Sequence, residues 1–413
     1  MKKNITVAIL IICSVAIFGQ SFEEPKLTGD EFEKLNVKVG GDFALQYQIL
    51  DHSADSALIP LGTGFNLPTA NFNLDVMLAS GIKLNLVTYL SARHHNEAWV
   101  KGGYLLIDKL PFIKSPKVDK IMDYLTLKVG DMEVNYGDAH FRRSDNGHVT
   151  KNPFVGNYIM DAFTTATALE LMYRNNGLIF MGAVSSGTLR PDLVRFSSNT
   201  YTAYDAHKEL VFYWKAGFDK QLSEDIRARL TVSGWHQGKH HFGSLYSGDR
   251  AGSRYYLVMK NVTNASTDVD IKSGHTTGRW GPGITDKDNS LMVNLFGKAK
   301  GLELFGTYEM ASGKYGSGNE FKFSQIGIEG LYRFGGQEQF YGGARYNMVK
   351  GDVNTAVSGD QSVNRLQVGA GWFMLESTVL KVEYVNQNYV DFLSDYGADA
   401  GFNGLMIEAA ISF

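Results

Sequence analysis

The residues best suited to bind a charged solute lie in one short segment, 137–147, and just beyond it. Arg142 and Arg143 are adjacent there, Asp145 follows closely, and Lys151 lies a little further along the chain. A guanidinium group stays charged and can bind a carboxylate or a phosphate through two parallel hydrogen bonds, so an arginine pair is suited to anions. The alternative is that both arginines pair with neighbouring aspartates and only brace the segment.

Further basic residues recur at alternate positions of segments that are otherwise rich in apolar residues. Because successive side chains of a β-strand point to opposite faces, residues two positions apart share a face. We therefore expect a polar face that forms the wall of a water-filled lumen, where charged side chains set ion preference. A slight basic excess on this face favours anions, unless most of these residues only pair with acids across strands. The candidate wall residues are Lys215, Arg227, Arg229, Arg345, Arg365 and Lys381.

Other kinds of chemistry find little support in the residue types. The sequence has no nucleophile elbow, and the Gly-rich stretch at 313–318 lacks the Lys-Ser/Thr ending of a phosphate-binding loop. Histidines at 94–95 and 236–241 lie in or beside predicted loops, and the one cysteine, Cys13, offers them no thiolate partner. We expect no enzyme activity, no metal, no cofactor and no nucleic-acid partner.

The elements that must carry these residues are long strands. From Leu35 to Ile49 every second residue is apolar or Gly, and the residues between them are mostly polar. Such a strand suits a tilted crossing of a bilayer, which takes about 9–11 residues. The pattern recurs along the chain and predicts an all-β, antiparallel, up-and-down transmembrane barrel. The sixteen predicted strands lie near 34–50, 70–79, 82–92, 97–107, 122–135, 163–174, 178–186, 208–219, 225–236, 289–299, 302–312, 321–334, 339–350, 362–374, 378–389 and 404–413.

The connections between these strands alternate between short and long. Turns such as 79–81 are tight, whereas 137–162 and 237–288 are long. Short periplasmic turns and long outer loops are typical of bacterial outer-membrane barrels. One turn, 108–121, is longer than this pattern predicts. Residues 255–262 could form a further hairpin, so eighteen strands remain an alternative.

The first residues have the pattern of an export signal. A basic start precedes an apolar run at 5–18, and small or polar residues follow it. The run is too short for a permanent membrane helix, which takes about 20 apolar residues. We predict a secretory signal peptide at 1–21 that is removed, a short periplasmic segment at 22–33 and a barrel from 34 to 413.

Aromatic residues mark the ends of several predicted strands. Phe218, Phe334 and Phe413 fall on the lipid-facing register, where they would form part of an aromatic girdle. A C-terminal aromatic residue on this register resembles the recognition signal of outer-membrane barrels. We therefore expect a protein of the bacterial outer membrane that contacts lipids and lipopolysaccharide and is inserted by the barrel-assembly machinery.

Residues 127–130 and 134–137, followed by 140–143 and 152–153, resemble the phosphate-selective porin group. In that group a strand ends near a Gly-containing bend and leads into a long loop, and the third loop of sixteen-stranded porins commonly folds into the barrel. The resemblance implies a pore constriction at 137–162 and a porin channel for passive diffusion of small hydrophilic solutes or ions. Porins of this size often form homotrimers. The alternatives are a surface-binding or assembly partner and a gated transporter of a specific solute.

Overall fold

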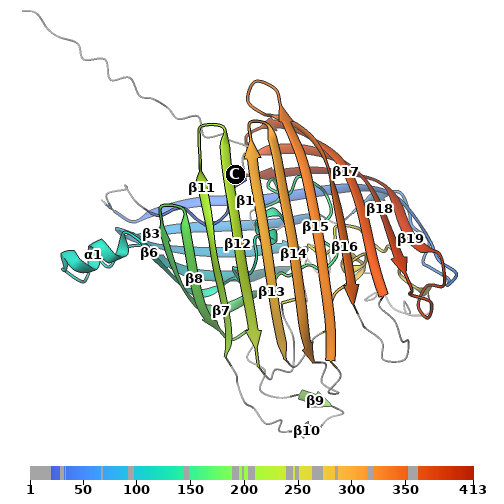
Figure 1. Cartoon of the computed structure of the whole chain (residues 1–413), viewed down its shortest axis with the longest axis horizontal. Coiled ribbons are helices and arrows are strands. Elements are labelled where there is room, and N and C mark those ends of the chain that lie inside the picture. The colour runs from blue at the N-terminus through green and yellow to red at the C-terminus, as the bar shows by residue number, and fades with distance from the viewer. Residues whose placement is uncertain are drawn as a thin grey trace, which may run out of the picture.

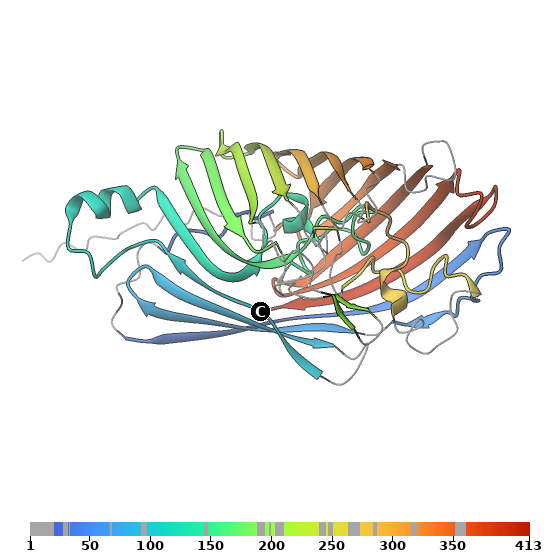
Figure 2. The same ribbon diagram turned by 90° about the horizontal axis from the view of Figure 1, so that it is seen from below.

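Sixteen long antiparallel strands close into a barrel in the computed structural model (Figure 1, Figure 2). The predicted number of strands is confirmed. The eighteen-stranded alternative is wrong, because residues 255–260 lie in no strand. The structure describes residues 20–27, 32, 34–66, 68–91, 97–143, 148–187, 195–197, 200–202, 210–238, 245–246, 251–262, 273–283, 287–314, 320–351 and 361–413.

Each wall strand pairs with its neighbour along the chain, and short elements lie between some of them. The wall strands are β1 (Asn36–Ser53), β3 (Thr69–Ala79), β4 (Ile82–Ser91), β5 (Glu97–Ile107), β6 (Leu125–Glu133), β7 (Thr165–Asn175), β8 (Leu178–Ser185), β11 (Val211–Gln221), β12 (Ile226–Gln237), β13 (Asp288–Ala299), β14 (Leu302–Lys314), β15 (Glu320–Phe334), β16 (Phe340–Gly351), β17 (Gln361–Leu375), β18 (Thr378–Val390) and β19 (Ala400–Ser412). The other elements are β2 (Gly64–Phe65), β9 (Arg195–Ser197), β10 (Thr200–Thr202), α1 (Pro116–Met122), η1 (Ala139–Arg142) and η3 (Ser273–Thr276). No helix in the described ranges is long and apolar enough to cross a membrane.

The barrel is closed by pairing between its first and last strands. The register of β1 and β19 runs from Asp42 opposite Ser412 to Ser53 opposite Gly401. Beyond it, the Gly41 N–H donates to the Phe413 carbonyl at 2.9 Å, and the Phe413 N–H donates to the Gly41 carbonyl at 3.0 Å. The closed ring gives every wall strand a partner on both sides, as a membrane interior demands.

The side chains of the wall alternate as the sequence predicts. On β1 the apolar Val37 and Val39 are 50% and 56% exposed on the outer surface, whereas Asp42 and Gln46 are buried on the inner surface. This is the reverse of a soluble protein. It fits a barrel whose outer face meets lipid, where a basic residue at mid-depth would cost about 2–4 kcal/mol.

Short turns join the strands at one end of the barrel, called here the turn end, and long loops join them at the other, the loop end. Asn176 and Gly177 connect β7 to β8 with positive φ values of 49° and 91°, which suits a tight two-residue hairpin. The β9–β10 hairpin lies at the loop end (Figure 1). The long connection 108–124 at the turn end carries α1, which explains its length.

Aromatic side chains gather on the outer surface near the turn end. The Phe334 ring centroid lies 5.7 Å from that of Phe340, which in turn lies 6.0 Å from Trp372, and both pairs are stacked. Phe218 occupies the outward register of β11 opposite the exposed Leu230. An aromatic band of this kind is typical of the membrane interface of outer-membrane barrels.

We expect Phe413→Ala to lower the amount of folded barrel in the outer membrane, because it removes the terminal ring while leaving the backbone pair with Gly41 intact. Heat-dependent migration of membrane fractions on gels measures the folded fraction. Phe334→Ala is the matched control, since it removes an exposed ring at the same end of the barrel. An equal loss in both variants would show that the girdle, and not the terminal residue, determines assembly.

Candidate functional site in the barrel lumen

The connection between β6 and β7 folds into the barrel and packs against the inner face of the wall (Figure 2). The Val155 N–H donates to Glu383 Oε2 on β18 at 2.7 Å, and the Ile159 N–H donates to Asn347 Oδ1 on β16 at 2.7 Å. Polar side chains on the inner face of the wall thus accept hydrogen bonds from loop N–H groups that have no backbone partner. The third loop enters the lumen as expected, while its role as a constriction stays a prediction.

Arg142 and Arg143 are both buried in this connection, and both form ion pairs. Arg142 Nη2 lies 3.0 Å from Glu329 Oε2 on the wall. Arg143 binds Asp161 through Nε at 2.9 Å and Nη2 at 2.7 Å. This geometry favours the bracing alternative, with acids that are distant in sequence rather than adjacent. Asp145 lies outside the described residues.

Two other titratable side chains of this connection lie among wall charges. Burial and the nearby Arg333 guanidinium lower the pKa of the Lys151 ammonium group, and Glu303 opposes them. Burial lowers the pKa of His148 to about 4, although Glu133 opposes it. His148 is therefore neutral near pH 7. Lys151 lies near an arginine and an acid of the wall, so it is not an isolated charge in an open channel.

A second segment, from the connection between β12 and β13, also folds into the barrel, which the sequence did not predict. Arg254 Nη2 lies 2.6 Å from Glu408 Oε2. The Tyr255 hydroxyl donates to Glu383 Oε1 at 2.6 Å. Apolar side chains of both ingoing connections then pack on the wall and fill this part of the lumen. The cluster includes Val155, Ile159, Met160, Tyr255, Val258 and Met259, with Val349, Val363 and Val385 of the wall.

All six candidate wall residues lie on the inner face, but they bind ingoing segments or neighbouring acids. Arg345 Nε lies 2.9 Å from Glu329 Oε1, and its Nη1 donates to the Gly156 carbonyl at 2.8 Å. Lys381 pairs with Glu408 at 2.8 Å. Five of the six are buried, and Arg227 is partly buried. The remaining contacts are Arg365 with the Asn157 carbonyl, Lys215 and Arg229 with Asp138, and Arg227 with Asp219.

Residues 20–27 lie inside the turn end of the barrel and belong to no strand or helix. Phe22 is buried between Phe141 and Phe296, with ring centroids 5.8 Å and 5.3 Å away. Arg174, next to the β7–β8 turn, donates from Nη1 to the Glu24 carbonyl at 2.7 Å. The predicted periplasmic segment therefore begins within the barrel mouth. No spacing of residues in the sequence predicted these contacts.

A polar cavity of about 420 Å³ remains in the lumen beside β3–β7, between the N-terminal segment and the β6–β7 connection. Ingoing segments fill the side of the lumen along β15–β19, so this cavity is the space that a hydrated solute could use. Its charged lining holds more acids than lysines and arginines, unlike the basic excess predicted for the whole wall. The basic residues are Lys83, Lys101, Lys128 and Arg174, and the acids are Glu23, Glu24, Asp75, Asp131, Glu133 and Glu170.

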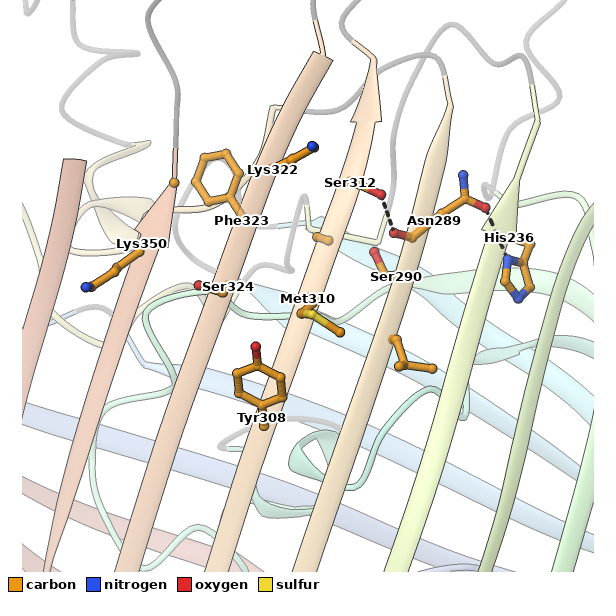
Figure 3. Close-up of a pocket in the computed structure, with 13 residues that line it drawn as sticks. His236, Asn289, Ser290, Tyr308, Met310, Ser312, Lys322, Phe323, Ser324 and Lys350 are labelled. Atoms are coloured by element: carbon orange, nitrogen blue, oxygen red, sulfur yellow. Dashed lines mark hydrogen bonds between the residues drawn. The ribbon is translucent and has the colours of Figure 1, made fainter. Parts of the chain in front are cut away.

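A second hollow, of about 550 Å³, lies on the outer face of β12–β16 near the loop end (Figure 3). Tyr308, Met310 and Lys322 line it from the outward register, and all three are exposed. At its edge, His236 Nδ1 lies 3.1 Å from Asn289 Oδ1. The hollow faces away from the lumen and lies outside any solute path through the barrel.

Solved structures of outer-membrane barrels share this fold. The anion-selective porin from Comamonas acidovorans matches with a TM-score of 0.52 and 10% identity, over 92% of this chain and 100% of that chain. OmpT, an outer membrane protein of Vibrio cholerae in its trimer form, matches with a TM-score of 0.50 and 12% identity, over 92% and 100%. The outer membrane channel DcaP of Acinetobacter baumannii matches with a TM-score of 0.50 and 10% identity, over 93% and 99%.

At such low identity these likenesses show the fold alone. No protein-family model matches the sequence, and no curated protein matches it. The porin-type barrel expected from the sequence is confirmed, and these neighbours do not support the narrower phosphate-selective group. The chain thus has the fold of bacterial outer-membrane porins and channels.

We expect Arg143→Met to lower the free energy of unfolding by about 3–5 kcal/mol, because it leaves Asp161 buried without its bidentate partner. In the double variant Arg143→Met/Asp161→Asn neither charge remains, so most of the stability should return. The temperature at which the folded band disappears from gels measures both effects. If Arg143→Met leaves that temperature unchanged but shifts the ion selectivity of the channel, Arg143 is a filter residue and not a brace.

Proposed function

We propose that the protein is an outer-membrane channel through which small hydrophilic solutes diffuse passively along the β3–β7 side of the lumen. The polar cavity on that side carries this proposal. Several of its charged side chains keep access to solvent. Asp75 is 35% exposed and Lys83 14%, whereas Arg345 on the filled side is 0% exposed. Side chains that stay accessible within a lumen can replace the hydration of a passing solute.

The charge of this cavity bears on ion selectivity. With six acids against four lysines and arginines in its lining, the cavity favours cations weakly while the N-terminal segment is in place. The anion preference expected from the sequence rested on basic residues such as Arg345 and Lys381, which are buried in ion pairs. We therefore propose a weakly selective channel.

A gated transporter of a specific solute is the second candidate. It is favoured by the amount of chain inside the barrel, because the β6–β7 and β12–β13 connections and the N-terminal segment all enter the lumen. Passage of a larger solute would require one of them to move. The assembly that we propose is a homotrimer, by analogy with the trimer form of OmpT.

Planar-bilayer recording of the purified mature chain tests the channel and its route. Val87 lines the cavity from β4, so Val87→Trp should narrow the path and reduce the unit conductance to roughly half. Leu86, the adjacent residue, faces lipid and is 39% exposed, and Leu86→Trp should leave the conductance unchanged. An equal effect of both substitutions on the conductance would indicate that the solute route lies elsewhere in the lumen. The absence of current from folded protein would favour the gated transporter.

A further inference from the structure

The N-terminal segment 22–27, which remains after the predicted removal of residues 1–21, is held in the barrel mouth mainly by side chains. It forms no β-ladder with the wall strands, whereas each wall strand is paired on both sides. Phe22 anchors it, with the Arg229 guanidinium 4.2 Å from its ring centroid. Lys26 Nζ donates to the Leu125 carbonyl at 2.8 Å. Such a segment can leave its place without breaking the sheet.

Glu23 shares two cations of β11 and β12, Lys215 and Arg229, with Asp138. Both of its carboxylate oxygens accept hydrogen bonds from Arg229, at 2.6 Å and 2.7 Å. Its Oε1 also lies 3.6 Å from Lys215 Nζ. Burial would raise the pKa of Glu23, but these two cations outweigh it and lower the pKa to about 2. The carboxylate is therefore charged at any pH near neutrality.

Glu24 fills a second basic site, on β4 and β6. Its Oε2 lies 3.1 Å from Lys83 Nζ, and its Oε1 lies 3.1 Å from Lys128 Nζ. The Tyr104 hydroxyl donates a further hydrogen bond to Oε1. Burial would raise the pKa of Glu24, but Lys128 and Lys83 outweigh it and lower the pKa to about 2. In the described part of the chain, Lys128 has no other carboxylate at ion-pair distance.

The arrangement around Glu24 is that of a carboxylate ligand in a binding site. Two ammonium groups and a phenol hydroxyl converge on one carboxylate, and this group lines the cavity along the proposed solute path. A backbone loop that only sealed the mouth would not need charged groups matched to it in this way. Without Glu24, Lys128 has no carboxylate at ion-pair distance among the described residues. Lys83 keeps only Asp75, at 3.3 Å. The two ammonium groups should therefore favour another anion in the place of Glu24.

We propose that Glu23 and Glu24 occupy the binding site of a solute with several carboxylate groups, and that this solute binds the channel by displacing the N-terminal segment. The inference rests on the proposed channel function and names the class of solute for the cavity. The segment is attached to β1 by a short stretch of chain, so its carboxylates act at an effective concentration on the order of millimolar. A free solute must therefore reach comparable concentrations to compete with them.

Citrate binding to the full mature chain, folded in detergent, tests the proposal. Glu23→Gln/Glu24→Gln replaces both tethered carboxylates with neutral amides. Lys83 and Lys128 then become available to citrate, whereas Lys215 and Arg229 stay paired with Asp138. Calorimetry should show that citrate binds this variant at least about tenfold more tightly than the wild type, because it no longer competes with the segment. Adding Lys83→Gln/Lys128→Gln to the variant should return the affinity to the wild-type level.

Glu303→Gln is the matched control, because Glu303 is an inward acid that pairs with Arg333 at 2.7 Å but belongs to the wall. It should leave citrate affinity unchanged. Equal citrate affinity in wild type and Glu23→Gln/Glu24→Gln, both shown to be folded by heat-dependent migration, overturns the proposal. An equal gain in citrate affinity in Glu303→Gln also overturns the proposal, because loss of any inward acid would then be enough to make citrate bind.

Bilayer recordings distinguish failure of this inference from failure of the proposed channel function. If the wild type carries no current, the channel is contradicted, whatever the calorimetry shows. If the wild type conducts and the citrate affinities are equal, only the anion site is contradicted. If the wild type conducts and the variant binds citrate more tightly, two further effects are expected. Glu23→Gln/Glu24→Gln should shift the reversal potential toward anions, and citrate should block its current at lower concentration than in the wild type.

Discussion

Closure of the sheet is the constraint on which the rest of this structure depends. A strand that crosses lipid has no water to satisfy its N–H and C=O groups, so each must find a partner within the protein. β1 and β19 complete that pairing over twelve residue pairs, and Phe413 extends it to the end of the chain. Closure places every inward side chain in a tube. The protein must then supply water or partners for the charges inside.

Partners for these charges come from the parts of the chain that are not wall. Glu329 of β15 accepts from Arg345 of the wall, from Arg142 of the β6–β7 connection and from Tyr158 of the same connection. A buried charge is tolerated only when it is paired and hydrogen-bonded, so the wall and the ingoing segments require each other. The basic residues that suggested anion selectivity from the sequence are thus mainly structural.

The filling of the lumen is uneven. Apolar residues of two ingoing connections pack along β15–β19, while a polar cavity stays beside β3–β7. The N-terminal segment borders that cavity and contributes two of its acids. This segment precedes the first wall strand in sequence but lies inside the barrel in space.

The sequence by itself determined the inward and outward registers of the wall and its turn end, because a period of two and turn residues are local properties. It left sixteen and eighteen strands as alternatives, and the closed barrel decided for sixteen. Arg142, Arg143 and the six candidate wall residues lie inside the barrel, and their roles in selectivity stay predictions. Their partners, the entry of residues 251–262 and the docking of Glu23 and Glu24 were decided by the tertiary structure alone. These contacts join residues that are far apart in sequence, such as Glu23 and Arg229, and no spacing along the chain encodes which charges meet once the barrel has closed.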